Sequence, residues 1–166
     1  NYEITGKNGS GKTTLIMCIS NNFIGNTFNS NIRRKDTSLM EIGSSPSLMP
    51  ELSLLENIKY FLFNDNINEN MISNVLNKYE LESFKSDIVG DFSSGMVKRS
   101  EIAIADLKNP KVLCIDEPKV YLDENGVDLL LNLITKREKE GSTSILSSQE
   151  SIGSFTSIER SFNLDD

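Results

Sequence analysis

The sequence predicts an α/β fold built on a mainly parallel sheet. Short apolar segments typical of strands alternate along the 166 residues with segments of helical periodicity. A Gly-rich turn, "GKNGSGKT" at 6–13, joins the first apolar segment to the first helical one. The stretch "VLCID" at 112–116 is typical of a buried strand, and parallel strands need helical crossovers between them.

Each element follows from its local pattern. Strands are predicted at 1–5, 39–45, 112–116 and 143–149, with an edge strand at 158–166. Helices are predicted at 12–20, from 53 onward, across 64–85, after the Gly/Ser turn at 90–95, and at 124–140. Ser53 is a suitable N-cap, because Glu56 three residues later completes a capping box. The polar, Asn-rich residues 21–38 predict a loop or weak hairpin.

The length fits one domain with two parts. Residues 1–45 and 101–166 are predicted to form the α/β core. Residues from about 46 to 100 are almost purely helical in pattern and are predicted to form a helical subdomain. Because residue 1 already lies inside a predicted strand, we expect an upstream portion that carries the missing N-terminal strands.

Composition limits the classes of function. The formal net charge of −7 argues against nucleic acid as the main partner. No apolar run approaches the about 20 residues of a membrane-spanning helix. Cys18 and Cys114 lack metal-ligand spacing and are expected to be buried free thiols in a reducing compartment. The chain holds no His, 18 Asn and only 2 Ala, a bias typical of AT-rich coding in an organelle or endosymbiont.

The stretch at 6–14 has the spacing of a phosphate-binding loop. Its glycines let the backbone turn tightly and point N–H groups at phosphate oxygens, and the helix N-terminus that follows adds positive charge. Lys12 suits the β- and γ-phosphates, and the Thr13 hydroxyl suits Mg²⁺. An ordinary Gly/Ser-rich turn is the alternative, which the strand–loop–helix context disfavours. The candidate nucleotide-binding residues are Gly6, Asn8, Gly9, Ser10, Gly11, Lys12, Thr13 and Thr14.

Two carboxylates follow the predicted strand at 112–116. Asp116 is predicted to hold Mg²⁺, and Glu117 to orient and deprotonate the attacking water. The alternative is a strand that ends in a solvated acidic turn. Together with the phosphate-binding loop upstream, the carboxylates favour a nucleotide site.

The segment "FSSGM" at 92–96 resembles the Leu-Ser-Gly-Gly-Gln signature of the ATP-binding cassette (ABC) family. Lys98 and Arg99 supply the basic pair that follows this signature, whereas Met96 departs from it. "VYLD" matches the loop after the second carboxylate, whose Asp (Asp123 here) communicates between subunits in the family. Five motifs occur in the family's order, and the resemblance covers nearly the whole chain.

This resemblance implies a P-loop NTPase with the ABC-type nucleotide-binding fold, which uses ATP and Mg²⁺. The family works as a dimer, so a second ABC ATPase subunit, identical or different, is implied as partner. Each ATP lies between one subunit's phosphate-binding loop and the other's signature. The residues implied to face the partner's nucleotide are Ser93, Ser94, Gly95 and Asp123. The family's adenine-stacking aromatic residue lies upstream of residue 1.

A narrower resemblance involves "IGSSPSLMPELSLLENIKYF". It is similar to a segment of the ATPase subunit of the cytochrome c maturation exporter, which handles haem. Shared residues are Gly43, Pro46, Glu51, Leu52, Leu55, Glu56 and Asn57. It implies a peripheral position on an inner membrane, on the mitochondrial matrix side or the bacterial cytoplasmic side.

Two polar residues expected from the family are missing. Ser45 stands where a Gln ligates Mg²⁺, and Gln149, or in the alternative alignment Ser148, stands where a His contacts the γ-phosphate. Gln donates a hydrogen bond but carries no charge. Loss of the charged contact costs about 2–4 kcal/mol of transition-state stabilisation, on the order of 10²–10³ in rate. We therefore predict ATP binding with slow hydrolysis.

Three functions compete. The first is a transporter ATPase that docks its helical subdomain on a multi-pass membrane subunit for haem delivery, with Met40, Met49 and Leu54 as candidate interface residues. Ordinary core packing is the alternative for the apolar segment at 47–62. The second is a catalytically degenerate cassette that serves as a structural subunit of a mitochondrial membrane assembly, which Ser45, Met96 and Gln149 favour. The third, a DNA-repair or translation ATPase, lacks support because no coiled-coil insertion or basic surface is evident.

Overall fold

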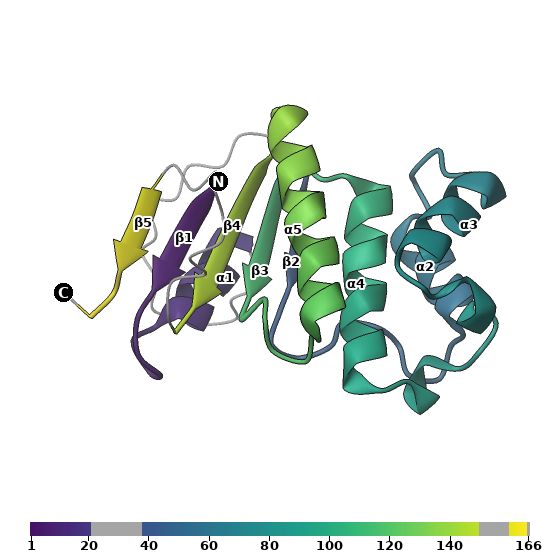
Figure 1. Ribbon diagram of the computed structural model, residues 1–166, viewed down its shortest axis with the longest axis horizontal. Helices are drawn as coiled ribbons and strands as arrows, with labels where there is room; N and C mark the ends of the chain where they lie inside the picture. Colours follow the sequence, from purple (N-terminus) through teal and green to yellow (C-terminus); the bar gives the residue numbers. More distant parts are fainter. Residues whose placement is uncertain (21–37, 150–159, 166) are drawn as a thin grey trace. The chain divides into compact units, whose positions relative to one another are not determined.

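A computed structural model describes residues 1–20, 38–149 and 160–165 (Figure 1). The chain forms two compact units. The first comprises 1–44, 110–120 and 134–166, and the second 45–109 and 121–133. The predicted loop at 21–38 lies almost wholly outside the described residues, as do the first residues of the predicted edge strand.

The first unit contains the predicted parallel sheet. Its five strands are ordered β2-β3-β4-β1-β5, and every adjacent pair is parallel (Figure 1). The strands are β1 Tyr2–Thr5, β2 Leu39–Ile42, β3 Val112–Asp116, β4 Thr143–Ser148 and β5 Arg160–Asn163. Helix α1, Lys12–Ser20, packs against β2, β3 and β4. The prediction of an α/β fold with a parallel sheet is confirmed.

The strand register brings three strand ends together. Thr5, at the end of β1, pairs with Ser148 of β4, and Asp116, at the end of β3, pairs with Ser147. Because these strands are parallel, the loop after β1 and the acidic pair after β3 leave the same edge of the sheet, on either side of β4.

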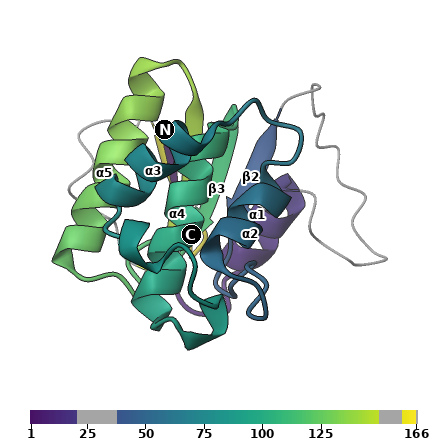
Figure 2. The same cartoon turned by 90° about the vertical axis from the view of Figure 1, so that its right-hand side faces the viewer.

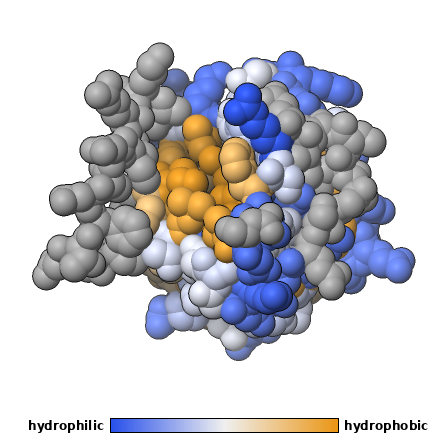
Figure 3. Space-filling view, turned by 90° about the vertical axis from the view of Figure 1, so that its left-hand side faces the viewer, coloured by the Kyte–Doolittle hydropathy of each residue, from blue (hydrophilic) through white to orange (hydrophobic). Residues whose placement is uncertain are grey.

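The core of the first unit joins β1, α1 and β3 through Ile4, Ile16 and Cys114. Both cysteines are free and buried, as predicted. Burial, and secondarily the nearby Glu41 carboxylate, raises the pKa of the Cys114 thiol to about 12. Figure 3 shows an apolar surface at the end of the unit where β1 and β5 lie. Leu15, Ile19 and Leu164 are partly buried apolar residues that pack against this core, and Phe162 of β5 is exposed.

The second unit is helical. It contains α2 Leu54–Phe61, α3 Glu69–Lys78, the 3₁₀ turns η1 Glu82–Phe84 and η2 Val89–Asp91, α4 Ser94–Lys108 and the first part of α5 Glu124–Lys139. Helices α2 and α3 both pack against α4 (Figure 2). No helix in the described part of the chain is long and apolar enough to cross a membrane.

The predicted capping box opens α2. The Glu56 amide donates to Ser53 Oγ at 3.3 Å, and the Ser53 amide donates to Glu56 Oε2 at 2.8 Å. The helix predicted across 64–85 is shorter than expected. Asn68 caps its start by accepting from the Met71 amide at 3.0 Å, and Glu80, at φ 59°, ends it in the left-handed region.

One candidate interface residue was predicted wrongly. Leu54 is fully buried at the start of α2, whereas Met40 and Met49 are half-buried. Leu54 is the first residue of α2, which packs against α4, and it lies among the buried residues of this helix. The apolar residues that α2 and the following turn expose are Tyr60 and Phe63 instead, at 62% and 84%.

Candidate nucleotide-binding site

The loop between β1 and α1 leaves open space beside two of its glycines. Gly9 and Gly11 have φ of 84° and 98°, and no atom lies within 4 Å of where a Cβ would stand on either. The turn closes through Ser10 N to Lys7 O at 3.2 Å. The buried hydroxyl of Ser10 has no hydrogen-bond partner among the described residues, which fits a loop that takes a polar ligand.

Lys12, the first residue of α1, is 5% exposed. Its Nζ donates to the carbonyls of Gly6 at 2.6 Å and Lys7 at 3.0 Å. The ammonium is therefore held at the start of the loop by two neutral carbonyl acceptors. An anionic phosphate is a stronger acceptor than either carbonyl, so the loop offers a cation that a nucleotide can recruit.

Asp116 lies at the centre of the site and is 1% exposed. One carboxylate oxygen accepts from the Thr13 hydroxyl at 2.8 Å, and the other accepts from the Ser147 hydroxyl. Thr13 and Asp116, predicted from segments about a hundred residues apart, thus meet. A carboxylate and a hydroxyl are the hard oxygen ligands that Mg²⁺ prefers, so the residues present fit the metal.

Glu117 follows Asp116 in the left-handed region, at φ 48°, and its amide donates to the Ser147 carbonyl at 2.9 Å. Burial raises the pKa of the Glu117 carboxyl. The Lys12 ammonium and the backbone N–H of Gln149 lower this pKa, and the Asp116 carboxylate raises it further. A partly buried carboxyl with a raised pKa beside a cation is suited to act as a general base.

Ser147 is a residue that sequence analysis missed. It lies on β4 between β1 and β3, pairs with Asp116 in register, and contacts both acidic residues through its hydroxyl or carbonyl. Only the polar character of "SSQ" at the end of an apolar strand hinted at it. Gln149 follows β4, is exposed, and has its backbone near Glu117.

The predicted residues of the signature, with Asp123 and Ser45, lie in the second unit, whereas Asn8 and Thr14 lie in the loop and in α1 of the first unit. Ser93 caps α4, accepting from the Met96 amide at 3.2 Å, and Asp123 caps α5, accepting from the Gly126 amide at 2.8 Å. A Cβ on Gly95 would meet the Tyr121 carbonyl at 3.0 Å, so this position favours glycine. Ser45 is exposed. Lys12, Thr13, Asp116, Glu117 and Gln149 therefore belong to the first unit. The second unit contains Ser45, Ser93, Ser94, Gly95 and Asp123.

Fold and site together define a P-loop nucleotide-binding domain. The family described as ABC transporter matches residues 1–120 of the chain. The chain therefore belongs to the ABC transporter family, as an ATP-binding cassette subunit.

Two relatives illustrate the spread of transporters that the chain resembles. The lantibiotic transport ATP-binding protein SrtF of Streptococcus pyogenes is 36% identical over 156 residues, which cover 89% of this chain and 67% of SrtF. The cytochrome c biogenesis ATP-binding export protein CcmA of Shewanella oneidensis is 29% identical over 160 residues, which cover 91% of this chain and 74% of CcmA. The narrower resemblance to the cytochrome c maturation exporter is therefore one of several.

Among solved structures, the chain is similar to a dimeric ATP-binding cassette in a post-hydrolysis state bound to ADP and Pi. The TM-score is 0.74 at 23% identity, with 90% of this chain and 74% of the other covered. This likeness shows the ABC ATPase fold.

Proposed function

We propose that this cassette binds Mg-ATP through its first unit and hydrolyses it slowly to drive or gate a membrane transporter. The observation that carries the proposal is the contact between Thr13 and Asp116 beside Lys12 and Glu117. Lys12 binds the β- and γ-phosphates, and Thr13 and Asp116 hold the metal. Glu117 accepts the proton of the attacking water.

Dimerisation completes the site. The signature and Asp123 belong to a unit separate from the phosphate-binding loop, which suits a role toward the nucleotide of a second subunit. The cassette of similar fold is a dimer, which supports the same arrangement here. Whether the second subunit is identical or different follows from the mass of the ATP-bound species.

Slow hydrolysis is tested by restoring the missing charge. Gln149→His is expected to raise the single-turnover rate at saturating Mg-ATP about tenfold or more, because a His adds a charge-assisted contact to the transferring phosphoryl group. The Kd for ATP should stay nearly constant. Gln149→Ala is the control and should give no gain. An unchanged rate in the His variant would contradict the role given to position 149.

A cytochrome c maturation exporter is the transporter we propose. The similarity of 43–57 to that exporter's segment and the match to CcmA support it. The match to SrtF makes a lantibiotic-type exporter the principal competitor. Affinity purification from the native membrane followed by mass spectrometry tests this proposal. A multi-pass haem-handling subunit supports it, and a peptide exporter overturns it.

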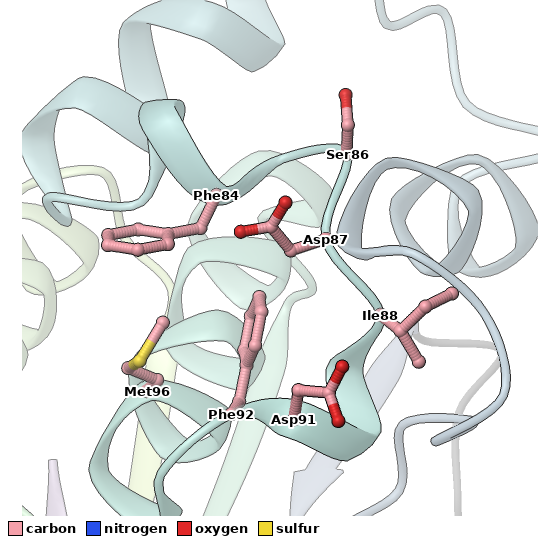
Figure 4. Close-up of a pocket in the computed structure, with 7 residues that line it drawn as sticks. All are labelled: Phe84, Ser86, Asp87, Ile88, Asp91, Phe92 and Met96. Atoms are coloured by element: carbon pink, nitrogen blue, oxygen red, sulfur yellow. The ribbon is translucent and has the colours of Figure 1, made fainter.

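The second unit contains a surface pocket suited to the membrane partner. It has a volume of about 470 Å³ and is lined by Phe84, Ser86, Asp87, Ile88, Asp91, Phe92 and Met96 (Figure 4). The rings of Phe84 and Phe92 lie edge to face, with 6.5 Å between their centroids. Phe84 is 39% exposed and Ile88 is 42% exposed. Exposed apolar side chains beside two carboxylates fit a short partner loop with apolar and basic side chains.

Charge reversal in this pocket tests the docking proposal. Asp87→Lys is expected to reduce recovery of the membrane subunit in co-purification about tenfold, because like charges then face each other. Asp128→Lys, an exposed site on α5, makes the same charge change and should leave recovery intact. Both variants should bind Mg-ATP like the unchanged chain. Equal loss with both variants would exclude the pocket as a specific docking site.

A further inference from the structure

The Asp165 carboxylate contacts the phosphate-binding loop, although it belongs to no nucleotide-binding motif. The Lys7 amide donates to Asp165 Oδ1 and Oδ2, both at 3.0 Å. The contact arises from strand pairing. Thr5 of β1 pairs with Asn163 of β5, and the Leu164 amide then donates to the Thr5 carbonyl at 2.9 Å. The next residue of each segment therefore continues side by side, which brings Asp165 to the start of the loop.

This contact leaves one peptide group between two opposite charges. The Gly6–Lys7 peptide accepts from the Lys12 ammonium through its carbonyl at 2.6 Å and donates to the Asp165 carboxylate through its N–H. In a trans peptide these two groups point in opposite directions. A cation at the oxygen and an anion at the hydrogen therefore favour the same orientation of the peptide.

Gly6 by itself does little to fix this peptide. Gly6 has φ 151°, a conformation that side-chain-bearing residues rarely adopt, and a Cβ there would stand 2.7 Å from Ser10 Oγ. Glycine is required, but glycine also permits many backbone orientations. When a nucleotide recruits Lys12 to its phosphates, the Gly6 carbonyl loses its cation. The Lys7–Asp165 hydrogen bonds are then what keeps the peptide in place.

We propose that Asp165 is a positioning residue of the nucleotide site, which holds the Gly6–Lys7 peptide so that the loop stays shaped for phosphate. The proposal rests on the proposed binding of Mg-ATP. It gives a role to the chain segment after β5, at the far end of the sequence from the loop.

Three variants of the full chain test this role: Asp165→Ala, Asp165→Asn and the charge-matched control Asp128→Ala. Asp165→Ala is expected to raise the Kd for Mg-ATP about 5- to 10-fold, because both hydrogen bonds from the Lys7 amide are lost at a partly solvated site. Asp165→Asn keeps an acceptor and should stay within about twofold. Asp128→Ala should match the unchanged chain. Calorimetry with Mg-ATP measures these affinities.

Hydrogen exchange at the Lys7 amide, without nucleotide, is the second readout. Protection should be lost in Asp165→Ala and kept in Asp165→Asn. A purely structural role in the segment after β5 would instead lower the melting temperature of both variants alike. Unchanged affinity in Asp165→Ala overturns the positioning role alone. Tighter binding overturns it as well, by showing that the carboxylate repels the nucleotide. If the unchanged chain does not bind Mg-ATP, the proposed function fails, and with it this role.

Discussion

Lys12→Ala is expected to raise the Kd for Mg-ATP at least about 100-fold, because two or more charge-assisted contacts to the phosphates are lost at a buried position. Lys12 is 5% exposed, and its ammonium is bound to two loop carbonyls. The ammonium therefore already lies at the loop before the nucleotide recruits it, and no other cation within the described first-unit site takes its role. Fluorescence titration with an ATP analogue measures the effect.

The same loop offers a matched control. Lys7 is exposed, and the contacts of this residue with Lys12, Ser10 and Asp165 run through its backbone. Lys7→Ala removes the same charge from the same loop and should change the Kd less than about twofold, since an exposed cation is screened by solvent. Equal weakening by Lys7→Ala and Lys12→Ala would mean that general loop charge, and not a positioned ammonium, binds the nucleotide.

Local signals made most of the site predictable. The strand–loop–helix sequence at 1–20, the Ser53 capping box and the acidic end of β3 each depend on residues a few positions apart. Such patterns are read directly from a sequence, because helix starts and tight turns are set by short-range sterics and hydrogen bonds. The convergence of Thr13 and Asp116 followed from the rule that parallel strands end at one edge of the sheet.

Long-range register was not predictable in the same way. Ser147 reaches Asp116 only because β4 pairs with β3 at a particular offset, and Asp165 reaches Lys7 only because β5 pairs with β1 at a particular offset. A shift of one residue would turn each side chain to the other face of the sheet. No local pattern specifies that offset. The end of α3 at Lys78, which a periodicity extending to 85 did not indicate, is likewise set by a single left-handed residue, Glu80.

Assignment of the transported species needed more than motifs. The phosphate-binding loop and the signature serve every ABC transporter, so they identify the family and leave the cargo open. The segment at 43–57 favoured one exporter, yet relatives named for different transporters match over similar parts of the chain. Side chains that contact the membrane partner, for which we propose those around Asp87, decide this question.

Glu117→Gln is expected to lower single-turnover hydrolysis about 10²–10³-fold while ATP binding is retained, because the amide keeps the shape of the side chain but cannot accept a proton. With hydrolysis blocked, the ATP-bound form should accumulate as a dimer, seen by light scattering with Mg-ATP. Glu51→Gln, at an exposed glutamate, is the control and should hydrolyse like the unchanged chain.

The pH dependence of hydrolysis gives an independent test of the same base. The reactive form of Glu117 is the carboxylate. Burial raises the pKa of this group, although the Lys12 ammonium and the backbone N–H of Gln149 oppose the rise. The rate should therefore fall on acidification at a higher pH than the usual range of glutamate implies, and recover fully as pH rises. Glu117→Gln should lose this titration from its residual rate. An unchanged rate and pH profile in the variant would show that another group activates the water.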